Sequence, residues 1–379
     1  KKAEELYSLE SRTFLESTGI YHFPLFCYLV DCGFNASIIN PIITHSTKNG
    51  NIRKVKNDKI DSKGIAKLGL SKDIPVSQFP AKLVLELRSL TRKYYDLTDE
   101  RSAHINKLKG DLHTVFPQYL DVFCDVTGKT STMILRQYGT PDKILRGHKK
   151  TMIEKISKAS RKGLAKASER YEKLCAAANA AKTFGCQIDS IYFNIFLTLD
   201  LVEKLDSALD SILNRIRQLI TFNKNEKFIQ QIKLLNTIPG VGFLTAVTIM
   251  CEIGDFSAFR NPKQLFAYFG LDPEVNESGK FVGTQLHMSK RGSRIARRAI
   301  FAVALASIRT KRNGEGINPY LRKYYELKSG QKPKMVAIGA VMHKVCNIVF
   351  AVLRDEKAFE LRSPEEHCKQ YQRPALAAA

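Results

Sequence analysis

The sequence has 379 residues, with 60 Lys or Arg against 37 Asp or Glu, so its formal net charge at pH 7 is +23. A hydrophobic content of 44% supplies enough apolar material for packed cores, and the length predicts two or three domains. A charge this positive favours a polyanion, either nucleic acid or an anionic membrane surface. The membrane is the weaker option, because the longest clean apolar run, residues 299–306, falls far short of the ~20 residues that a spanning helix needs.

Two further features of the composition exclude other classes of protein. The eight cysteines contain no C-x-x-C pair, so neither a zinc site nor a disulfide framework is predicted and reduced, buried thiols are expected. No signal-peptide pattern precedes the first domain, and this predicts a cytoplasmic protein.

Residues 1–79 have the pattern of an α/β domain. Two short apolar runs, each followed by turn residues, predict strands, and amphipathic stretches between them predict helices. The expected elements are a helix at 2–9, a strand at 13–16, a helix at 21–32, a strand at 36–39 and a helix at 58–68. The last of these begins in acids, as helix N-termini prefer.

Residues 80–233 are expected to be helical, with long helices at 83–116 and 190–220. Apolar residues recur mostly at threes and fours in the first, which indicates either a coiled-coil arm or a long bundle helix. In the second helix, leucines follow at strict intervals of four, at Leu197, Leu201, Leu205, Leu209 and Leu213. Residues 148–185 between them are rich in Lys and Ala and are also predicted to be helical.

Residues 234–360 are predicted to form a compact helical domain, and 361–379 a tail. Loops are expected to join helices at 243–251, 261–269, 291–309, 318–327 and 334–353.

Three acids suggest a metal site in the first domain. Glu16 ends a predicted strand, and Asp58 and Asp61 open a predicted helix three residues apart, hence on one face. Carboxylates so placed could hold Mg²⁺, a hard ion that takes oxygen ligands, and paired ions would activate a nucleophile and steady the leaving oxygen at phosphorus. The alternative is that the aspartates only favour the helix N-terminus and that Glu16 is a solvated strand end.

The tetrapeptide Pro239-Gly240-Val241-Gly242 lies between two helical segments and resembles a helix-hairpin-helix turn. Gly240 and Gly242 would let backbone N–H groups and a helix N-terminus approach a phosphate, without reading base sequence. The alternative is an ordinary glycine turn between packed helices.

A large excess of positive charge that points to a polyanion lies in residues 278–334, which hold fourteen Lys or Arg and two Glu. Ser278 heads this segment in a Ser-Gly turn, with Lys280 next to it. Five basic residues follow at helical spacing: Lys290, Arg291, Arg294, Arg297 and Arg298. A serine beside such a cationic face could attack a phosphodiester, with the cations stabilising the charge that develops at phosphorus.

Other interpretations of these serines remain open. Ser278 could lie in a plain surface turn. Ser289 competes with it as the nucleophile, although its position before a basic helix favours helix capping or phosphate contact.

Taken together, seven motifs resemble one known family. Those near the N-terminus are Leu15 to Tyr21 for E-x-T-G-x-Y, Ile39-Asn40-Pro41 for a V-N-P strand end, and Lys56 to Asp61 for K-x-D-x-x-D. Those near the C-terminus are residues 238–242, 269–271, 278–280 and 289–292. The chain is identified on these motifs as similar to the insertion sequence 110 transposases, the bridge-RNA-guided DEDD recombinases.

The resemblance implies a fold and a mechanism. It implies an RNase-H-like domain of the Holliday-junction-resolvase type, a coiled-coil middle and a C-terminal transposase domain. The last three acids of the family's tetrad map to Glu16, Asp58 and Asp61, and the first aspartate is expected on a strand before Lys1, so the chain as given is expected to be deficient in metal. Ser278 maps to the family's serine, which forms a 5′-phosphoserine link to DNA.

The resemblance also implies the partners. They are donor and target DNA, a noncoding guide RNA and further copies of the chain in a dimer or tetramer, in a prokaryotic cytoplasm at the nucleoid. Two other functions stay open: a non-catalytic nucleic-acid-binding relative that keeps the basic surface, and a structural coiled-coil adaptor, which would leave the C-terminal motifs without a role.

Overall fold

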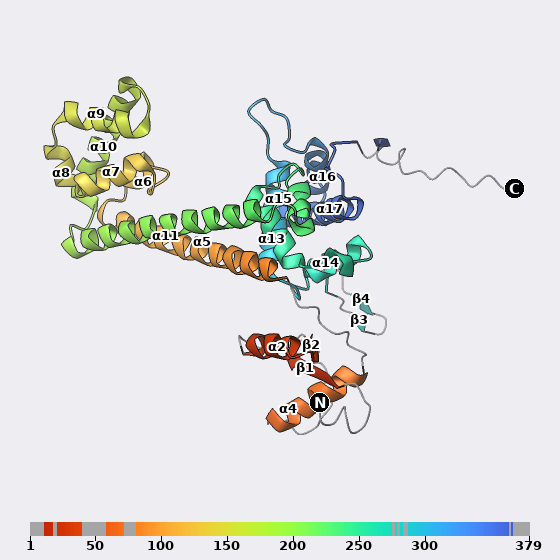
Figure 1. Cartoon of the computed structure of the whole chain (residues 1–379). Coiled ribbons are helices and arrows are strands. Elements are labelled where there is room, and N and C mark those ends of the chain that lie inside the picture. Colours follow the sequence, from red (N-terminus) through yellow and green to blue (C-terminus); the bar gives the residue numbers. More distant parts are fainter. Residues whose placement is uncertain are drawn as a thin grey trace. The chain divides into compact units, whose positions relative to one another are not determined.

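The computed structural model describes residues 11–17, 21–39, 58–71, 81–274, 277–278, 281–282, 287–363 and 365–366. The described part is mostly helical, with two small sheets of two strands each (Figure 1). The chain divides into two compact units, Lys1–Lys82 and Leu83–Ala379.

The first unit contains two parallel strands and two helices. Strand β1 (Arg12–Glu16) pairs with β2 (Asn35–Ile39), and Glu16 lies opposite Ile39. Helix α2 (His22–Asp31) makes the crossover that a parallel pair requires, and α4 (Asp58–Ser71) packs against β1. Both predicted strands and the helices expected at 21–32 and 58–68 are confirmed. The helix expected at residues 2–9 lies outside the described residues.

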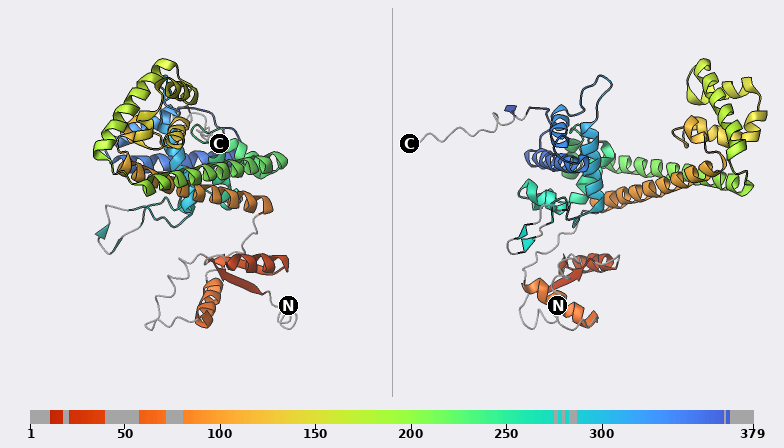
Figure 2. Two further views of the ribbon diagram at one scale, coloured as in Figure 1. Left: turned by 90° about the vertical axis from the view of Figure 1, so that its left-hand side faces the viewer. Right: turned by 180° about the vertical axis from the view of Figure 1, so that it is seen from behind.

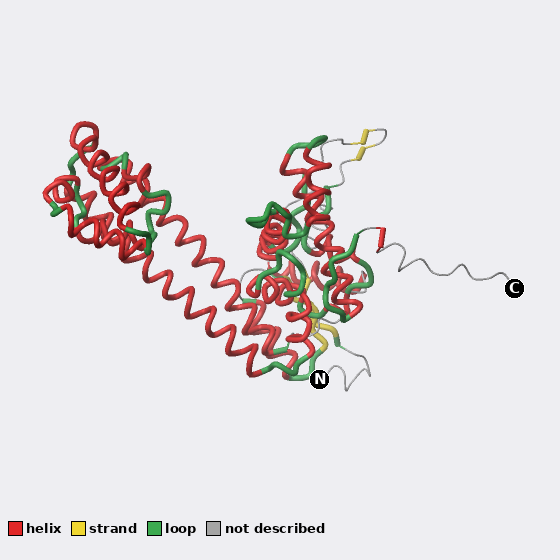
Figure 3. The backbone as a smooth tube through the Cα atoms, turned by 90° about the horizontal axis from the view of Figure 1, so that it is seen from above, coloured by secondary structure: helices red, strands yellow, loops and turns green. Residues whose placement is uncertain are grey.

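Two long helices, α5 (Lys82–Val115) and α11 (Asp189–Phe222), run side by side in the second unit (Figures 1 and 3). They are antiparallel, because the start of α5 shares a core with the end of α11 and their opposite ends share another. The shared residues are Leu83, Leu87, Ile216 and Leu219 in the first core, and Leu108, Leu112, Ile195 and Leu199 in the second. Arg101 and Asp206 form an ion pair between the two helices. The two predicted long helices are confirmed.

The leucines that follow at intervals of four in the sequence do not form one buried face of α11. Leu209 is buried, but Leu197 and Leu201 are 46% and 43% exposed, while Leu199 and Val202 are buried in their place. Four residues turn a helix by about 400°, so a row at fours winds some 40° further at each step and leaves the core side. The buried face instead follows a mixture of threes, fours and sevens.

A small helical domain, residues 116–188, connects α5 to α11, and its core is separate from that of the C-terminal domain. Its helices are α6 (Tyr119–Val122), α7 (Lys129–Gln137), α8 (Pro141–Arg146), α9 (Lys149–Ser160) and α10 (Leu164–Phe184). Tyr119 is buried near the start of this domain, where its hydroxyl donates a hydrogen bond to the Ser131 carbonyl at 3.0 Å. Helices α9 and α10 pack together as a hairpin.

The C-terminal domain is built from six α-helices in the described residues, around a core that also takes in the base of α5 (Figure 2). They are α12 (Lys227–Leu235), α13 (Phe243–Ile253), α14 (Pro262–Tyr268), α15 (Arg294–Ile308), α16 (Pro319–Ser329) and α17 (Lys334–Asp355). All five helices predicted in this region are confirmed, with ends that shift by up to three residues. Between α14 and α15 in the sequence, β3 (Glu277–Ser278) and β4 (Phe281–Val282) pair as a hairpin.

Helix α17 is, among the described residues, the one helix long and apolar enough to cross a membrane by length and composition. This is weak evidence, because 56% of its apolar window is buried, and Val341, Val345 and Val349 belong to the C-terminal core.

Candidate nucleic-acid interface

The interface begins at the turn between α12 and α13, where Gly240 has a φ of +96°. A Cβ at Gly240 would meet the Ser307 side chain of α15 at 2.5 Å, and the Ser307 hydroxyl donates to the Pro239 carbonyl at 2.9 Å. Gly240 therefore seats the turn against α15. Gly242 is the N-cap of α13, and a Cβ built on it would meet no other atom, so that helix start is open to a ligand.

Two loops interlock beside the start of α15. The backbone N–H of Ser289 donates to the carbonyl of Asp272 at 2.8 Å, and that of Lys290 to the carbonyl of Gly270 at 3.0 Å. A bridge between Pro273 and Met288 continues the pairing toward the β3–β4 hairpin. Ser278 therefore lies in a segment whose two ends are held together by these contacts.

The Ser289 hydroxyl is used within this loop pair. It donates to the Asp272 carboxylate at 2.6 Å, and the N-cap of α15 is Ser293, whose side-chain oxygen accepts from the N–H groups of Ile295 and Ala296. The interpretation of Ser289 as the helix cap was therefore wrong. The cap lies four residues after Ser289 and the helix begins at Arg294, three residues after the predicted start, because Ser293 stands directly before the first turn and satisfies two N–H groups there.

Arg297 fastens the same loops. Its Nη1 donates to the carbonyl oxygens of Phe269 at 3.3 Å, Lys290 at 3.2 Å and Gly292 at 2.6 Å. Burial lowers the pKa of this guanidinium, although an arginine stays protonated at neutral pH. Arg297 holds Lys290 and Arg291 at the surface, where both are exposed, and one of its nitrogens is already occupied by protein oxygens.

Arg294 and Arg298 form the outer part of the cationic surface. Both pair with Asp99 of α5, at 3.0 and 2.7 Å, and the Arg298 guanidinium lies over the Tyr95 ring at 4.8 Å. The Arg294 side chain is nevertheless 78% exposed. All three arginines of this turn line a groove of about 360 Å³ that is floored by apolar residues such as Phe301 and Met335. Cations at the start of a helix add to its positive end, so this groove attracts anions.

The long helix α5 supports this surface through a buried ion pair. Glu252 of α13 is 3% exposed, and Arg92 binds its carboxylate through two hydrogen bonds of 2.9 and 3.0 Å. Burial alone would raise the pKa of Glu252, but the hydrogen bonds from Arg92 and from the Ser293 side chain lower it below the usual value. Arg88 also donates to the Cys251 carbonyl at 2.7 Å. Both arginines thus tie α5 to the end of α13.

The other predicted site residues are placed less completely. Ser278 pairs with Phe281 in the β3–β4 hairpin, and Lys280 lies outside the described residues. Glu16 is at the end of β1, and Asp58 and Asp61 are in the first turn of α4, as expected. Within the described ranges, however, no three His, Cys, Asp or Glu side chains gather closely enough to hold a metal ion. The three acids have the right donor chemistry, but the described geometry does not assemble them into one cluster.

Sequence reasoning missed two features of this interface. Asp99 and Glu252 are acids far from the basic segment in sequence, and only the fold brings them to it. It also missed a basic run outside this interface, in the small helical domain, which a count of charges along residues 143–166 could have found.

Comparisons with known proteins agree with this arrangement. A DEDD transposase family model of the IS110 type matches residues 3–117, and the model of the IS116/IS110/IS902 transposase family matches residues 232–326. These two segments hold the acids of the first unit and most of the C-terminal interface.

Three relatives illustrate the similarity. An uncharacterized 43.6 kDa protein of insertion element IS110 from Streptomyces coelicolor is 23% identical over 286 residues, covering 75% of this chain and 66% of the relative. The pilin gene-inverting protein of Moraxella bovis is 30% identical over 177 residues, 46% of this chain and 52% of its own. The transposase for IS1111A from Coxiella burnetii is 26% identical over 188 residues, 48% and 50% respectively.

The matches thus span about half to two thirds of the length of these relatives. By both domain models and by the relatives it matches, the chain belongs to the IS110/IS116 family of transposases.

Proposed function

We propose that the chain is a DNA recombinase of a mobile element that cuts and rejoins strands through Ser278. The observation that carries this proposal is the cationic surface of Lys290, Arg291, Arg294 and Arg298, which follows directly on the segment bearing Ser278 in a chain of this family. The family membership supports DNA as the substrate. The alternative, a non-catalytic nucleic-acid-binding relative, shares the surface but has no covalent chemistry.

The covalent step balances without any outside oxidant or reductant. The Ser278 oxygen attacks phosphorus and gives up its proton to a base, while the 3′-oxygen of the cleaved strand leaves and takes up a proton. The product is a 5′-phosphoserine link, and attack by a 3′-hydroxyl of the partner strand releases the serine. Cations around phosphorus stabilise the additional negative charge of the transition state. We assign this role to Lys280 and the exposed cations of the surface, and we assign Arg297 to positioning the Lys290–Arg291 loop.

Two further contacts belong to the proposal. The open start of α13 at Gly242 would take a DNA phosphate, with Gly240 shaping the turn. Glu16, Asp58 and Asp61 would hold Mg²⁺ together with a further acid from a strand before Lys1, as the resemblance implies. Mg²⁺ would supply charge stabilisation at a phosphate oxygen. A noncoding guide RNA and a dimer or tetramer of the chain complete the proposed assembly.

The test is covalent trapping with a nicked suicide DNA substrate. The chain is expected to form an adduct, and Ser278→Ala to abolish it while leaving DNA binding intact. Ser289→Ala is the matched control: it removes the bond to Asp272 but is expected to keep the adduct. An adduct that survives in Ser278→Ala and disappears in Ser289→Ala would show that the wrong serine was chosen. Binding without any adduct in the unmodified chain would favour the non-catalytic relative.

A further inference from the structure

The small helical domain carries a second concentration of positive charge, remote in sequence from the interface described above. Residues 143–166 contain nine Lys or Arg and one acid, Glu154. This excess of eight charges in 24 residues is denser than the excess of twelve in residues 278–334, which spreads over more than twice the length.

The cations of this run lie on the outside of the α9–α10 hairpin. Lys155 and Lys158 are three residues apart and so lie near one another on α9, and Lys162 follows the end of the helix at Arg161. Lys149 is used internally, because it pairs with Glu172 at 2.7 Å. Four exposed lysines form no ion pair with any acid in the described part of the chain: Lys150, Lys158, Lys162 and Lys166.

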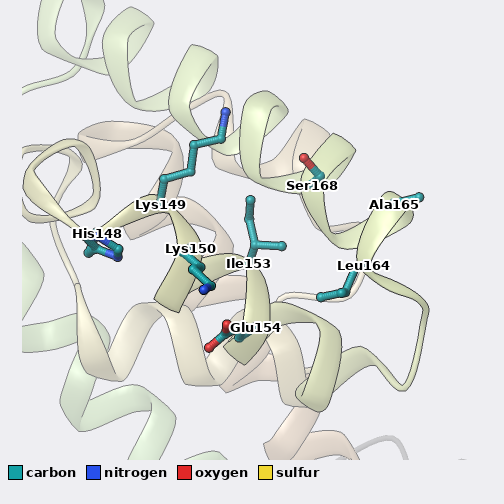
Figure 4. Close-up of a pocket in the computed structure, with 8 residues that line it drawn as sticks. All are labelled: His148, Lys149, Lys150, Ile153, Glu154, Leu164, Ala165 and Ser168. Atoms are coloured by element: carbon teal, nitrogen blue, oxygen red, sulfur yellow. The ribbon is translucent and has the colours of Figure 1, made fainter.

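A groove of about 690 Å³ lies between α9 and the start of α10 (Figure 4). Ile153 and Leu164 are apolar residues of its lining, which also includes His148, Lys149 and Lys150. Glu154 lies on the rim and is the one acid of the run. The groove thus combines a concave shape with cations in its lining. Glu154 is the acid among them and would repel a bound phosphate.

We propose that this α9–α10 surface binds the phosphate backbone of a nucleic acid, as a second contact separate from the C-terminal interface. Several exposed lysines without acidic partners on one helical hairpin suit repeated phosphates, because each neutralised phosphate releases counterions. An anionic membrane is disfavoured, because the apolar residues Met152 and Ile156 of α9 are fully buried in the domain core and so cannot insert into a bilayer. The proposal rests on the proposed function only in taking nucleic acid as the polyanion.

The experiment measures the salt dependence of binding by the full chain. Lys150, Lys158, Lys162 and Lys166 are all changed to Gln, and affinity for a 30-base-pair DNA duplex and for an RNA duplex is followed by fluorescence anisotropy over a salt series. Removing one phosphate contact flattens the log–log slope by roughly 0.7 to 0.9, so a decrease of about 3 to 4 is expected if all four lysines contact phosphates. Glu154→Gln is expected to strengthen binding, because it removes the opposing charge.

The matched control carries the same change in net charge elsewhere. Lys93, Lys107, Lys109 and Lys204 are exposed lysines of α5 and α11, and their change to Gln is expected to leave the slope nearly unaltered. A flatter slope with DNA alone, with RNA alone or with both supports the surface and names its ligand. Equal slopes in the two quadruple variants would overturn the proposal, as would binding to phosphatidylserine vesicles that depends on these lysines while nucleic-acid binding does not. Adduct formation by Ser278 is scored separately, so either proposal can fail alone.

Discussion

Glu252 is a buried carboxylate whose partner, Arg92, comes from a helix that precedes it by 160 residues in sequence. Removing one member of a buried pair leaves the other without compensation, at a cost of about 3 to 5 kcal/mol. We expect Arg92→Ala to lower the free energy of unfolding by about 3 kcal/mol. This value is at the lower end of that range because the arginine side chain itself is half exposed. Thermal unfolding followed by circular dichroism measures this change.

The same pair predicts a pH dependence. The folded pKa of Glu252 is lowered, so its contribution to stability is fully present above the pKa of the unfolded chain and is lost as the pH falls through the folded pKa. The difference in melting temperature between the unmodified chain and Arg92→Ala should therefore shrink below about pH 4. Arg136→Ala, which removes an exposed pair with Asp200 and Glu203, serves as the control and is expected to change little. A large destabilisation in that control and none in Arg92→Ala would contradict this interpretation.

Single residues also show where sequence reasoning reached its limit. Gly240 was expected to lie in a turn that approaches phosphate, and the turn exists, but the close neighbour of Gly240 is Ser307 of α15. Arg297 fits the same helical spacing as Arg294 and Arg298 in the sequence. Its guanidinium nevertheless donates hydrogen bonds to three backbone carbonyl groups, whereas the other two pair with Asp99. A helical period assigns a residue to a face, but it does not say which loops cover that face.

Among the elements, α15 carries the clearest prediction. Arg294→Gln with Arg298→Gln should flatten the salt slope of DNA binding by up to about 2 units, because each phosphate contact contributes about 0.9. The effect should be similar for DNA of unrelated sequences, because phosphate contacts position a protein without reading bases. Anisotropy titrations over a salt series measure the slope.

Asp99 provides the opposite variant. Asp99→Asn frees both arginines from an exposed ion pair that is worth about 1 kcal/mol at most, so the fold should persist while DNA binding strengthens. Arg297→Gln is the structural comparison, and it is expected to lower the melting temperature by exposing the loop carbonyls. If the double variant is fully folded and its slope is unchanged, α15 is not part of the binding surface.

At the level of elements the sequence was a good guide. Amphipathic periods and glycine or proline boundaries located the long helices and all five helices predicted in the C-terminal domain, because each buries one stripe and ends at a strong local signal. The start of α15 was misplaced because two serines, Ser289 and Ser293, both had the chemistry of a cap. The leucines at intervals of four on α11 do not all face the core, since only mixed spacings keep a stripe on one side of a helix.

For the whole molecule, the proposed metal site gives the widest test. In a chain extended by the strand that the resemblance places before Lys1, Asp58→Asn should lower recombination sharply and shift its Mg²⁺ requirement to higher concentration, since a carboxylate is removed from the ligand set. DNA binding, carried by the C-terminal interface, should remain. A recombination assay over a Mg²⁺ series measures both, with Asp31→Asn on α2 as the control. Undiminished recombination in Asp58→Asn would reduce this aspartate to a residue that favours the helix start.

The antiparallel pair of α5 and α11 has a consequence for the length of any bound polymer. Each helix has 34 residues, and at 1.5 Å per residue each is about 50 Å long. Arg294 and Arg298 meet α5 at Asp99, so about 24 Å of helix lies between the C-terminal cationic surface and Val115, where α5 enters the small helical domain. At 3.4 Å per base pair, 24 Å corresponds to roughly 7 base pairs. Shorter nucleic acids would reach only one of the two surfaces, so the helical pair sets a minimum length for a nucleic acid that contacts both.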